Sequence, residues 1–326
     1  MQFVSETETD SDSSSHGVLI DSTGDVVIKP CTEAEIDFYE KTLQLHRDFA
    51  AHMPTYMGQV RTKDDSNNDH HHAAVSSTPG TTLPSTALET ETAIVLENLA
   101  AGFVRPNILD IKLGARLWAD DAPLEKRARL DAVAASTTSG SLGFRVAGMR
   151  VWRGRPAGAV ESEGRTDPEA GYQIYDRTYG RNFNTVTVKT AFDEFFLPAD
   201  YACDIRARRH VVEKCVRELG ELQEKLEKME CRMYSASILC VYEGDNSALD
   251  AAIREERFPG RLDSDEESSE PEVPKVATLK LIDFAHAKWT PGFGPDENLL
   301  QGVRSVHRIL EDLLASSNTN GPTSDL

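Results

Sequence analysis

The stretch PNILDIKLG, residues 106–114, has the pattern of a buried strand and yet carries two opposite charges. Alternate residues of a strand share a face, so the apolar residues at 109, 111 and 113 point into a core, whereas Asp110 and Lys112 stand side by side on the other face. Burying a charge is costly unless it is paired or used. The two residues are therefore either a structural ion pair between lobes or a catalytic pair, with a carboxylate near an attacking hydroxyl and an ammonium on a transferring phosphoryl group.

Two further charged residues end or interrupt apolar, strand-like segments. Asp283 interrupts the run LKLIDFAH, and Mg²⁺ in phosphate-binding sites is held by one or two carboxylates. Lys29 ends the run VVIKP and is followed six residues later by Glu35, which imitates the lysine–glutamate pair of kinase-like folds. Each has a plainer alternative, since Lys29 could be an exposed strand end and Asp283 a helix cap.

Charge is distributed unevenly along the chain, whose formal net charge is −19. The segments 1–15 and 263–272 carry only acidic charges, whereas residues 101–155 hold ten Lys and Arg against five Asp and Glu. A basic segment inside an acidic protein suits a polyanionic ligand held locally. The overall charge argues against direct binding of nucleic acid, and the absence of a long apolar run argues against a membrane span. We expect a monomer.

Strands and helices mix along the chain without strict alternation, which predicts an α+β fold. Polar and acidic stretches separate the regular segments and indicate flexible tails and loops. The expected organisation, in chain order, is an acidic disordered tail at 1–15, an N-lobe at 16–99 with a flexible loop at 63–90, a C-lobe at 100–316 with an acidic loop at 259–275, and a tail at 317–326.

Hydrophobic periodicity places the individual elements. A hairpin precedes a helix that Thr32 caps, with Glu35 completing a capping box and Leu43 on the apolar face. The apolar stripe of the helix at 205–232 packs on the protein's own core or, as the alternative, on a partner helix. The other predicted strands lie at 93–99, 106–114, 144–152, 237–243 and 276–284, and the other predicted helices at 123–135 and 299–313.

Several of these segments match one family in order. PNILDIKLG resembles the P-x-x-x-D-x-K-x-G signature of the inositol polyphosphate kinases, and LIDFAH resembles their metal-binding I-D-F-A-H. VVIKP with EIDFY, TTSGSLGFRVAGMRVW, YGRNF and GPDENLLQG are similar to further elements of that family. The resemblance covers roughly residues 16–316 and is strongest to the inositol polyphosphate multikinases of fungi.

The resemblance implies a two-lobed, protein-kinase-like fold with antiparallel sheets and a helical segment near 123–135 that binds the inositol phosphate. It implies that Asp110 orients the accepting hydroxyl and that Lys112 contacts the transferred phosphate. It further implies Mg²⁺ as a cofactor, with Asp283 as its ligand.

ATP is the other cofactor that the resemblance implies, bound between the lobes. Lys29 would then contact the ATP phosphates, and Asp283 would reach them through the metal. The end of the strand at Glu97 and Leu99 would be the hinge, where backbone groups pair with adenine.

For the inositol phosphate, the resemblance implies contacts from Lys126 and Arg129, which are three residues apart and share a helix face. The plainer alternative for this basic run is a solvated face, and Arg127 points elsewhere. His286 and Arg177 are the remaining candidates for substrate binding.

The implied activity is that of an inositol polyphosphate multikinase, which phosphorylates inositol 1,4,5-trisphosphate successively to the tetrakis- and pentakisphosphate. The alternatives are a hexakisphosphate kinase or trisphosphate 3-kinase of the same family, or a transcription-complex scaffold with secondary kinase activity. In that last reading, transcription factors bind the acidic segments. A protein kinase is disfavoured because its glycine-rich, H-R-D and D-F-G motifs are missing. We expect the protein in the nucleus and cytoplasm.

Overall fold

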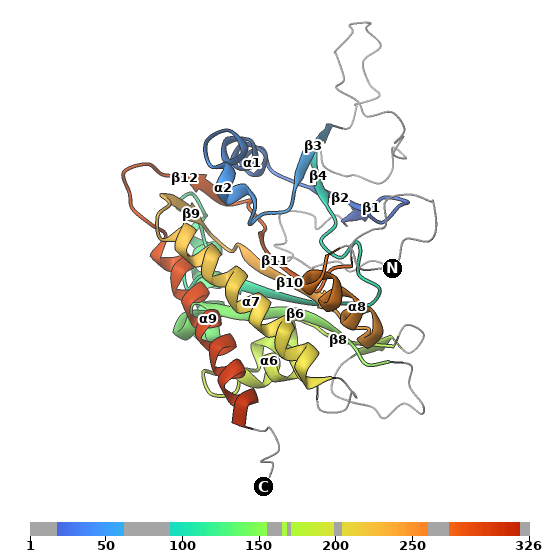
Figure 1. Cartoon of the computed structure of the whole chain (residues 1–326). Coiled ribbons are helices and arrows are strands. Elements are labelled where there is room, and N and C mark those ends of the chain that lie inside the picture. Colours follow the sequence, from blue (N-terminus) through green and yellow to red (C-terminus); the bar gives the residue numbers. More distant parts are fainter. Residues whose placement is uncertain are drawn as a thin grey trace, which may run out of the picture.

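The computed structural model describes residues 18–61, 92–154, 165–167, 171–198, 204–259 and 274–319 (Figure 1). The expected tail at 1–15 and loop at 63–90 lie outside these residues, as do most of 259–275 and 317–326. The described residues form two lobes, each built on its own antiparallel sheet.

The N-lobe is built on an antiparallel sheet of four strands in the order β1-β2-β4-β3. The predicted hairpin is confirmed, because β1 pairs with β2 across a turn in which Asp21 accepts hydrogen bonds from the amides of Gly24 and Val26. β3 was not predicted, since its half-exposed residues lack a continuous apolar run. The elements are β1 (Leu19–Ile20), β2 (Val26–Pro30), α1 (Glu33–Leu45), α2 (Arg47–Ala50), β3 (Tyr56–Arg61) and β4 (Thr92–Glu97).

Helix α1 begins where the sequence predicts, because the Thr32 hydroxyl accepts the amide of Glu35 at 3.2 Å. The carboxylate of Glu35 binds Lys29 and the amide of Phe284, so it belongs to the cleft between the lobes and not to a capping box. The expected apolar face was wrong at Leu43, which is 40% exposed.

The C-lobe sheet has the strand order β11-β10-β5-β6-β8-β7 and is antiparallel throughout. β5 lies in its interior, and the predicted alternation is confirmed, because Leu109, Ile111 and Leu113 are at most 2% exposed. The strands are β5 (Pro106–Leu113), β6 (Phe144–Trp152), β7 (Arg165–Asp167), β8 (Tyr172–Tyr175), β10 (Ser237–Glu243) and β11 (Ala277–Ile282), with β9 (Cys231–Met233) and β12 (Ala287–Trp289) in a separate pair.

Helices α7 and α9 lie side by side in opposite directions against the core of the C-lobe (Figure 1). The apolar stripe of α7 is buried in this core, as expected, but the helix ends at Leu226 and not at 232, since residues 231–233 pair with β12. The helices are α3 (Leu124–Ser136), α4 (Thr138–Leu142), α5 (Arg177–Arg181), α6 (Lys189–Phe196), α7 (Ile205–Leu226), α8 (Asn246–Arg257) and α9 (Glu297–Thr319).

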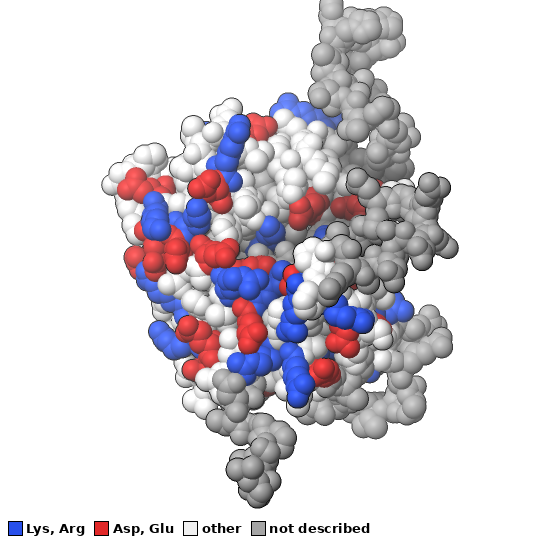
Figure 2. Space-filling model, in the orientation of Figure 1, with Lys and Arg blue, Asp and Glu red and all other residues white. Residues whose placement is uncertain are grey.

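Acidic and basic side chains are interspersed over the face that α7, α8 and α9 form (Figure 2). In the described residues, no helix is both long enough and apolar enough to span a membrane.

The N-lobe helices pack directly on the segment that follows β11. Trp289 stacks on Phe38 at 5.3 Å and on His46 at 3.7 Å between ring centroids, and Phe38 also stacks on Phe284. The amide of Leu281 donates to the carbonyl of His52 at 2.8 Å. These contacts fix α1 against the segment that contains Asp283.

Candidate active site

A chain of charges crosses the boundary between the lobes. Lys29, on β2, donates from Nζ to Oε1 of Glu35 at 3.0 Å and to Oδ1 of Asp283 at 2.7 Å. Glu35 is 1% exposed, and its Oε1 also accepts the amide of Phe284 at 3.1 Å. Lys29 and Glu35, near the start of the chain, are thereby joined to Asp283, 254 positions beyond Lys29, in one largely buried network.

Asp283 occupies a left-handed backbone position, with φ of +65°, directly after β11. Such a conformation is uncommon for a residue with a side chain, although Asp tolerates it better than most residues. The turn directs the carboxylate back toward Lys29. Backbone strain of this kind clusters at functional sites.

The charges in this network hold each other in the ionised state. Burial alone would lower the pKa of Lys29, but the carboxylates of Asp283 and Glu35 raise it above its ordinary value. Burial likewise opposes ionisation of Asp283, but the neighbouring ammonium groups of Lys29 and Lys112 lower its pKa overall. The site therefore keeps its ion pairs across the physiological pH range.

Strand β5 brings its charged face to the same place. Nζ of Lys112 lies 3.9 Å from Oδ2 of Asp283 and donates to the carbonyl of Ser235 at 3.2 Å. Asp110 stands one pleat away on the same face, where β5 and β6 have a bulge between Asp110 and Ile111. Asp110 and Lys112 share β5, as predicted, and the fold brings Asp283, which follows β11, next to Lys112.

Asp110 has a strongly altered acidity. Burial raises the pKa of Asp110 to about 6; the Lys112 ammonium opposes this rise and the Asp283 carboxylate adds to it. A carboxyl group with a pKa near the working pH can accept or share a proton during a reaction.

Two carboxylate oxygens in the cleft are suited to a divalent cation. Oδ2 of Asp283 and Oδ1 of Asp110 are buried and accept no hydrogen bond among the described residues. The described residues contain no cluster of three or more His, Cys, Asp or Glu side chains that could hold a metal alone. One or two carboxylates combined with substrate phosphates are the usual ligands of Mg²⁺, so Asp283 fits this role.

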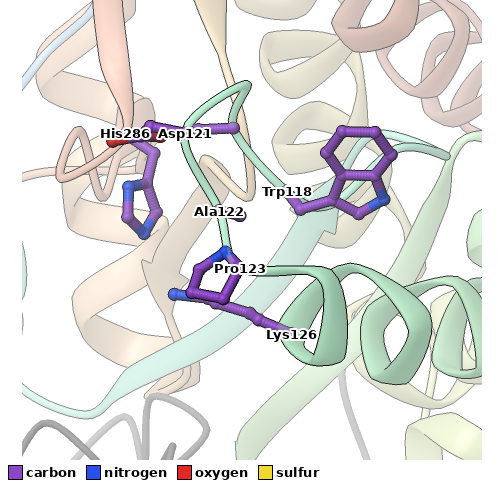
Figure 3. A pocket seen from close by; sticks show the side chains of 7 residues that line it. Trp118, Asp121, Ala122, Pro123, Lys126 and His286 are labelled. Atoms are coloured by element: carbon purple, nitrogen blue, oxygen red, sulfur yellow. The ribbon is translucent and has the colours of Figure 1, made fainter.

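A pocket of about 130 Å³ adjoins the charged cleft (Figure 3). Lys126, in the first turn of α3, and His286, three residues after Asp283, point toward each other across it. Burial lowers the pKa of His286, and the charges of Lys126 and Lys112 lower it further. The pocket is lined by Trp118, Ala119, Asp121, Ala122, Pro123, Lys126 and His286.

The structure brings two of the four expected substrate contacts to this pocket. Lys126 and His286 line it, whereas Arg129 and Arg177 are absent from its lining. The roles of all four remain predictions. Arg127 points elsewhere, as expected, and donates to the carbonyls of Ala122 and Asp120.

Sequence reasoning missed Arg145, which is 4% exposed. It lies on β6 opposite Lys112, and its Nη1 donates to the hydroxyl of Ser139 at 3.3 Å. Its charge also favours ionisation of Asp110, although burial outweighs this effect on the pKa. The run FRVAGMRVW signals a strand, but the alternation alone does not reveal which residue of β5 faces Arg145.

The expected hinge follows β4 and is tied to the N-lobe. The amide of Asn98 donates to the carbonyl of Asp25 and its side chain to that of Gly24, each at 2.7 Å. The carboxylate of Glu97 accepts the amide of Thr55 at 3.2 Å, and Leu99 is buried. The backbone of this segment is thus held in place, while its contact with adenine remains a prediction.

The arrangement has the parts that phosphoryl transfer requires, namely positioned cations and an acid near a pocket. Lys29 and Lys112 place positive charge where a phosphoryl group would develop negative charge. Asp110, with its pKa raised to about 6, has the acidity that suits a group accepting a proton from a hydroxyl. A divalent cation on Asp283 would supply further charge neutralisation.

Known proteins with similar sequences were found over nearly the whole chain. An inositol polyphosphate multikinase of Saccharomyces cerevisiae is 31% identical over 89% of this chain and 93% of its own length. One from Schizosaccharomyces pombe is 32% identical over 92% of this chain and 94% of its own length. The crystal structure of the inositol phosphate multikinase Ipk2 from S. cerevisiae, in complex with ADP and Mn²⁺, superimposes with a TM-score of 0.67 at 30% identity, covering 89% of this chain and all of that one.

The family model described as inositol polyphosphate kinase matches residues 93–311. This range contains β5, the acceptor pocket and Asp283, although Lys29 and Glu35 precede it. The match, the full-length relatives and the shared kinase-like fold agree with the chemistry of the cleft. The chain belongs to the inositol polyphosphate kinase family and is a kinase, a phosphotransferase that uses an alcohol group as acceptor.

Proposed function

We propose that this kinase transfers the terminal phosphate of ATP to inositol 1,4,5-trisphosphate and then to the product, which yields the tetrakis- and pentakisphosphate in succession. The proposal concerns the particular acceptor, the order of steps and the nucleotide. It rests mainly on one observation: Lys112 lies close both to Asp283 and to His286, which lines the pocket.

Lys112 contacts Asp283 on one side, at 3.9 Å between Nζ and Oδ2. On the other side its charge lowers the pKa of His286, after burial and Lys126. A phosphoryl group that passes from a nucleotide at Asp283 to an acceptor beside His286 would therefore remain close to this ammonium throughout. Such continuous charge neutralisation is the main contribution that a protein makes to phosphoryl transfer.

The proposed acceptor is a polyanion, and the pocket has a matching charge. Lys126 and Asp121 are the charged residues of its lining besides His286, and the charge of Lys112 reaches His286 and lowers the pKa of that imidazole. Each charge-assisted hydrogen bond to a phosphate contributes about 1.5–3 kcal/mol. Lys126 and Lys112 together support an acceptor that carries several phosphates.

Similarity favours the multikinase activity over the alternatives within the family. The two fungal multikinases align over about nine-tenths of this chain, whereas the inositol hexakisphosphate kinase 3 of Homo sapiens aligns over 68% of this chain and 51% of its own length at 28% identity. ADP and Mn²⁺ occupy the S. cerevisiae structure, which supports ATP with a divalent cation here. We propose Mg²⁺ as that cation, held by Asp283 and the nucleotide phosphates.

The test is product analysis. Purified protein is incubated with ATP, Mg²⁺ and inositol 1,4,5-trisphosphate, and the products are separated by anion-exchange chromatography over time. We expect the tetrakisphosphate to rise and then fall as the pentakisphosphate accumulates, with turnover by Asp110→Asn lowered by about 10²-fold or more. Accumulation of the tetrakisphosphate alone would indicate a trisphosphate 3-kinase, and turnover of hexakisphosphate alone a hexakisphosphate kinase. No turnover of any of these acceptors would refute the proposal.

A further inference from the structure

Trp118 is enclosed by two arginines at the edge of the acceptor pocket. The guanidinium of Arg116 lies 3.8 Å from the indole centroid and that of Arg127 lies 4.7 Å from it. The indole Nε1 donates to Oδ1 of Asp131 at 2.6 Å. Although Trp118 lines the pocket, its ring points away from His286 and toward α3 (Figure 3). The ring is therefore not placed to touch a ligand.

The same two arginines bind the loop between β5 and α3, residues 114–123, which carries Trp118. Nε of Arg116 donates to the Trp118 carbonyl at 3.1 Å, and Nε of Arg127 donates to the Ala122 carbonyl at 2.7 Å. Arg127 immediately follows Lys126 on α3. The first turn of this helix therefore both binds the loop, through Arg127, and carries the lysine that lines the pocket. A shift of the loop against α3 would move Lys126 relative to the other pocket residues.

Helix α3 packs on this loop through a small hydrophobic cluster that is separate from the main core. The cluster consists of Leu117, Leu130 and Ala134, with Trp118 and Val133 packed against it. In the described residues, the main core contains none of these side chains. The placement of α3 therefore depends on a few local contacts, in which the indole is the largest side chain.

A short bridge connects the loop to the catalytic strand. The hydroxyl of Ser235 donates to the carbonyl of Leu117 at 2.9 Å, and the carbonyl of Ser235 accepts from Nζ of Lys112 at 3.2 Å. Ser235 has a positive φ of 57°, which allows it to make both contacts. The loop is thus held in a fixed position relative to Lys112 on one side and to α3 on the other.

We propose that Trp118 is a positioning residue for acceptor binding, acting through Lys126 without contacting the substrate. The stack of Arg116, Trp118 and Arg127 fixes the loop and the first turn of α3 as one unit, and this unit sets the distance of Lys126 from His286 and Lys112. The proposal rests on the proposed function, since the acceptor is taken to be an inositol phosphate. Cation–π pairs of this type are most stabilising where water is partly excluded.

The test compares three variants by titration calorimetry and steady-state kinetics. Trp118→Leu keeps apolar volume but removes the ring, and Trp118→Phe restores a ring while omitting the hydrogen bond to Asp131. Trp152→Leu is the matched control, because Trp152 also stacks under an arginine, with Arg105 at 4.8 Å, but does not line the pocket.

We expect Trp118→Leu to weaken binding of inositol 1,4,5-trisphosphate about tenfold and to raise its KM about equally, while the KM for ATP and kcat at saturation stay within about twofold. Trp118→Phe should recover most of the lost affinity, and Trp152→Leu should leave both KM values near wild type. A merely structural role would instead lower the melting temperature and change all kinetic constants together.

Wild-type affinity for the trisphosphate in Trp118→Leu would overturn the proposal, and so would equal losses for both substrates. If Trp118→Leu fails to fold, Trp118→Met provides the same comparison, and failure of both to fold also overturns it. These outcomes differ from failure of the proposed function, in which the wild-type protein itself neither binds nor phosphorylates the trisphosphate. That result would overturn both proposals.

Discussion

Nζ of Lys29 lies 2.7 Å from Oδ1 of Asp283, and the two residues are 254 positions apart in the chain. This ion pair joins the N-lobe sheet to the turn after β11. Glu35 completes it from α1, where it is 1% exposed. Because two carboxylates share this ammonium, removal of Lys29 leaves Glu35 without its ion-pair partner and Asp283 with Lys112 alone.

Lys29→Met should therefore reduce both stability and activity. We expect a loss of about 2–3 kcal/mol in the free energy of unfolding, below the value for a fully buried pair because the Lys29 side chain is 20% exposed. Kinase activity should fall by about 10²-fold or more, since a cation on the phosphoryl group is lost. Chemical denaturation and initial-rate assays measure the two effects.

The double variant Lys29→Met, Glu35→Gln separates these effects. Neutralising Glu35 removes one uncompensated charge, so most of the stability should return while activity stays low. Recovery of activity together with stability would show that Lys29 serves only the fold.

The pKa of Asp110 predicts a pH limit on catalysis. Burial raises this pKa to about 6, the Lys112 charge opposes the rise and the Asp283 charge adds to it. The carboxylate must be ionised to accept a proton, so kcat/KM should fall tenfold per pH unit below about pH 6. Asp110→Asn should lower kcat by about 10²–10⁴-fold and remove this limb from the profile. An unchanged limb in Asp110→Asn would assign it to another group.

The raised pKa of Asp110 also predicts that Asp110→Asn, although it lowers activity, increases the stability of the fold. Because the folded-state pKa of Asp110 lies above its ordinary value of 3.8, the folded state binds the proton more tightly, and stability is lost as the pH rises from about 4 to 6. Above pH 6, Asp110→Asn should be more stable than wild type by up to about 3 kcal/mol. Denaturation at pH 4 and pH 8 checks the sign, since the difference should shrink at pH 4.

Lys126 and Arg129 are three residues apart on α3 but differ in their relation to the pocket. Lys126→Met should raise the KM for the trisphosphate by about 10–100-fold, because one charge-assisted hydrogen bond is removed. Arg129→Met, at an exposed position outside the pocket lining, should change it by less than about threefold. Raised salt should weaken binding in wild type more than in Lys126→Met.

The pKa of His286 provides an independent measure of the effect of Lys126→Met. Burial and the Lys126 charge lower the pKa of His286, so Lys126→Met should raise that pKa toward its ordinary value. NMR titration of the imidazole measures the change directly. A constant His286 pKa would mean that the two side chains do not face each other in solution.

Removal of divalent cations should abolish turnover, because Asp283 offers a buried carboxylate oxygen with no other hydrogen bond among the described residues. EDTA should eliminate activity and Mg²⁺ restore it, with the required concentration shifted strongly upward in Asp283→Asn. Activity of wild type in EDTA would exclude this role for Asp283.

Strand alternation was sufficient to predict which face of β5 carries Asp110 and Lys112, because the period of a strand is fixed by its geometry. The isolated Asp283 and Lys29 were also recognisable, since charges in apolar runs require an explanation. Their convergence was not derivable from the residues, because it depends on the packing of α1 against the segment after β11.

Other parts of the site depend on register between strands that are distant in sequence. Arg145 lies opposite Lys112 only because β5 and β6 pair in one particular register with a bulge. The predicted pair of Lys29 and Glu35 is confirmed, but the capping box was wrong, and the bond from the amide of Phe284 to Glu35 could not be predicted from local spacing. Helix periodicity likewise placed Lys126 and Arg129 on one face, but it could not predict that Lys126 lines the pocket and Arg129 does not.

The stacking of Trp289 on Phe38 and His46 has a consequence for control of the enzyme. In protein kinases, displacement of the helix that carries the glutamate switches the enzyme off. Here the corresponding helix, α1, is anchored by aromatic rings to the segment after β11, and Glu35 is further bonded to Phe284. An outward swing of α1 would break these contacts together, so we expect this helix to keep its position with and without bound nucleotide.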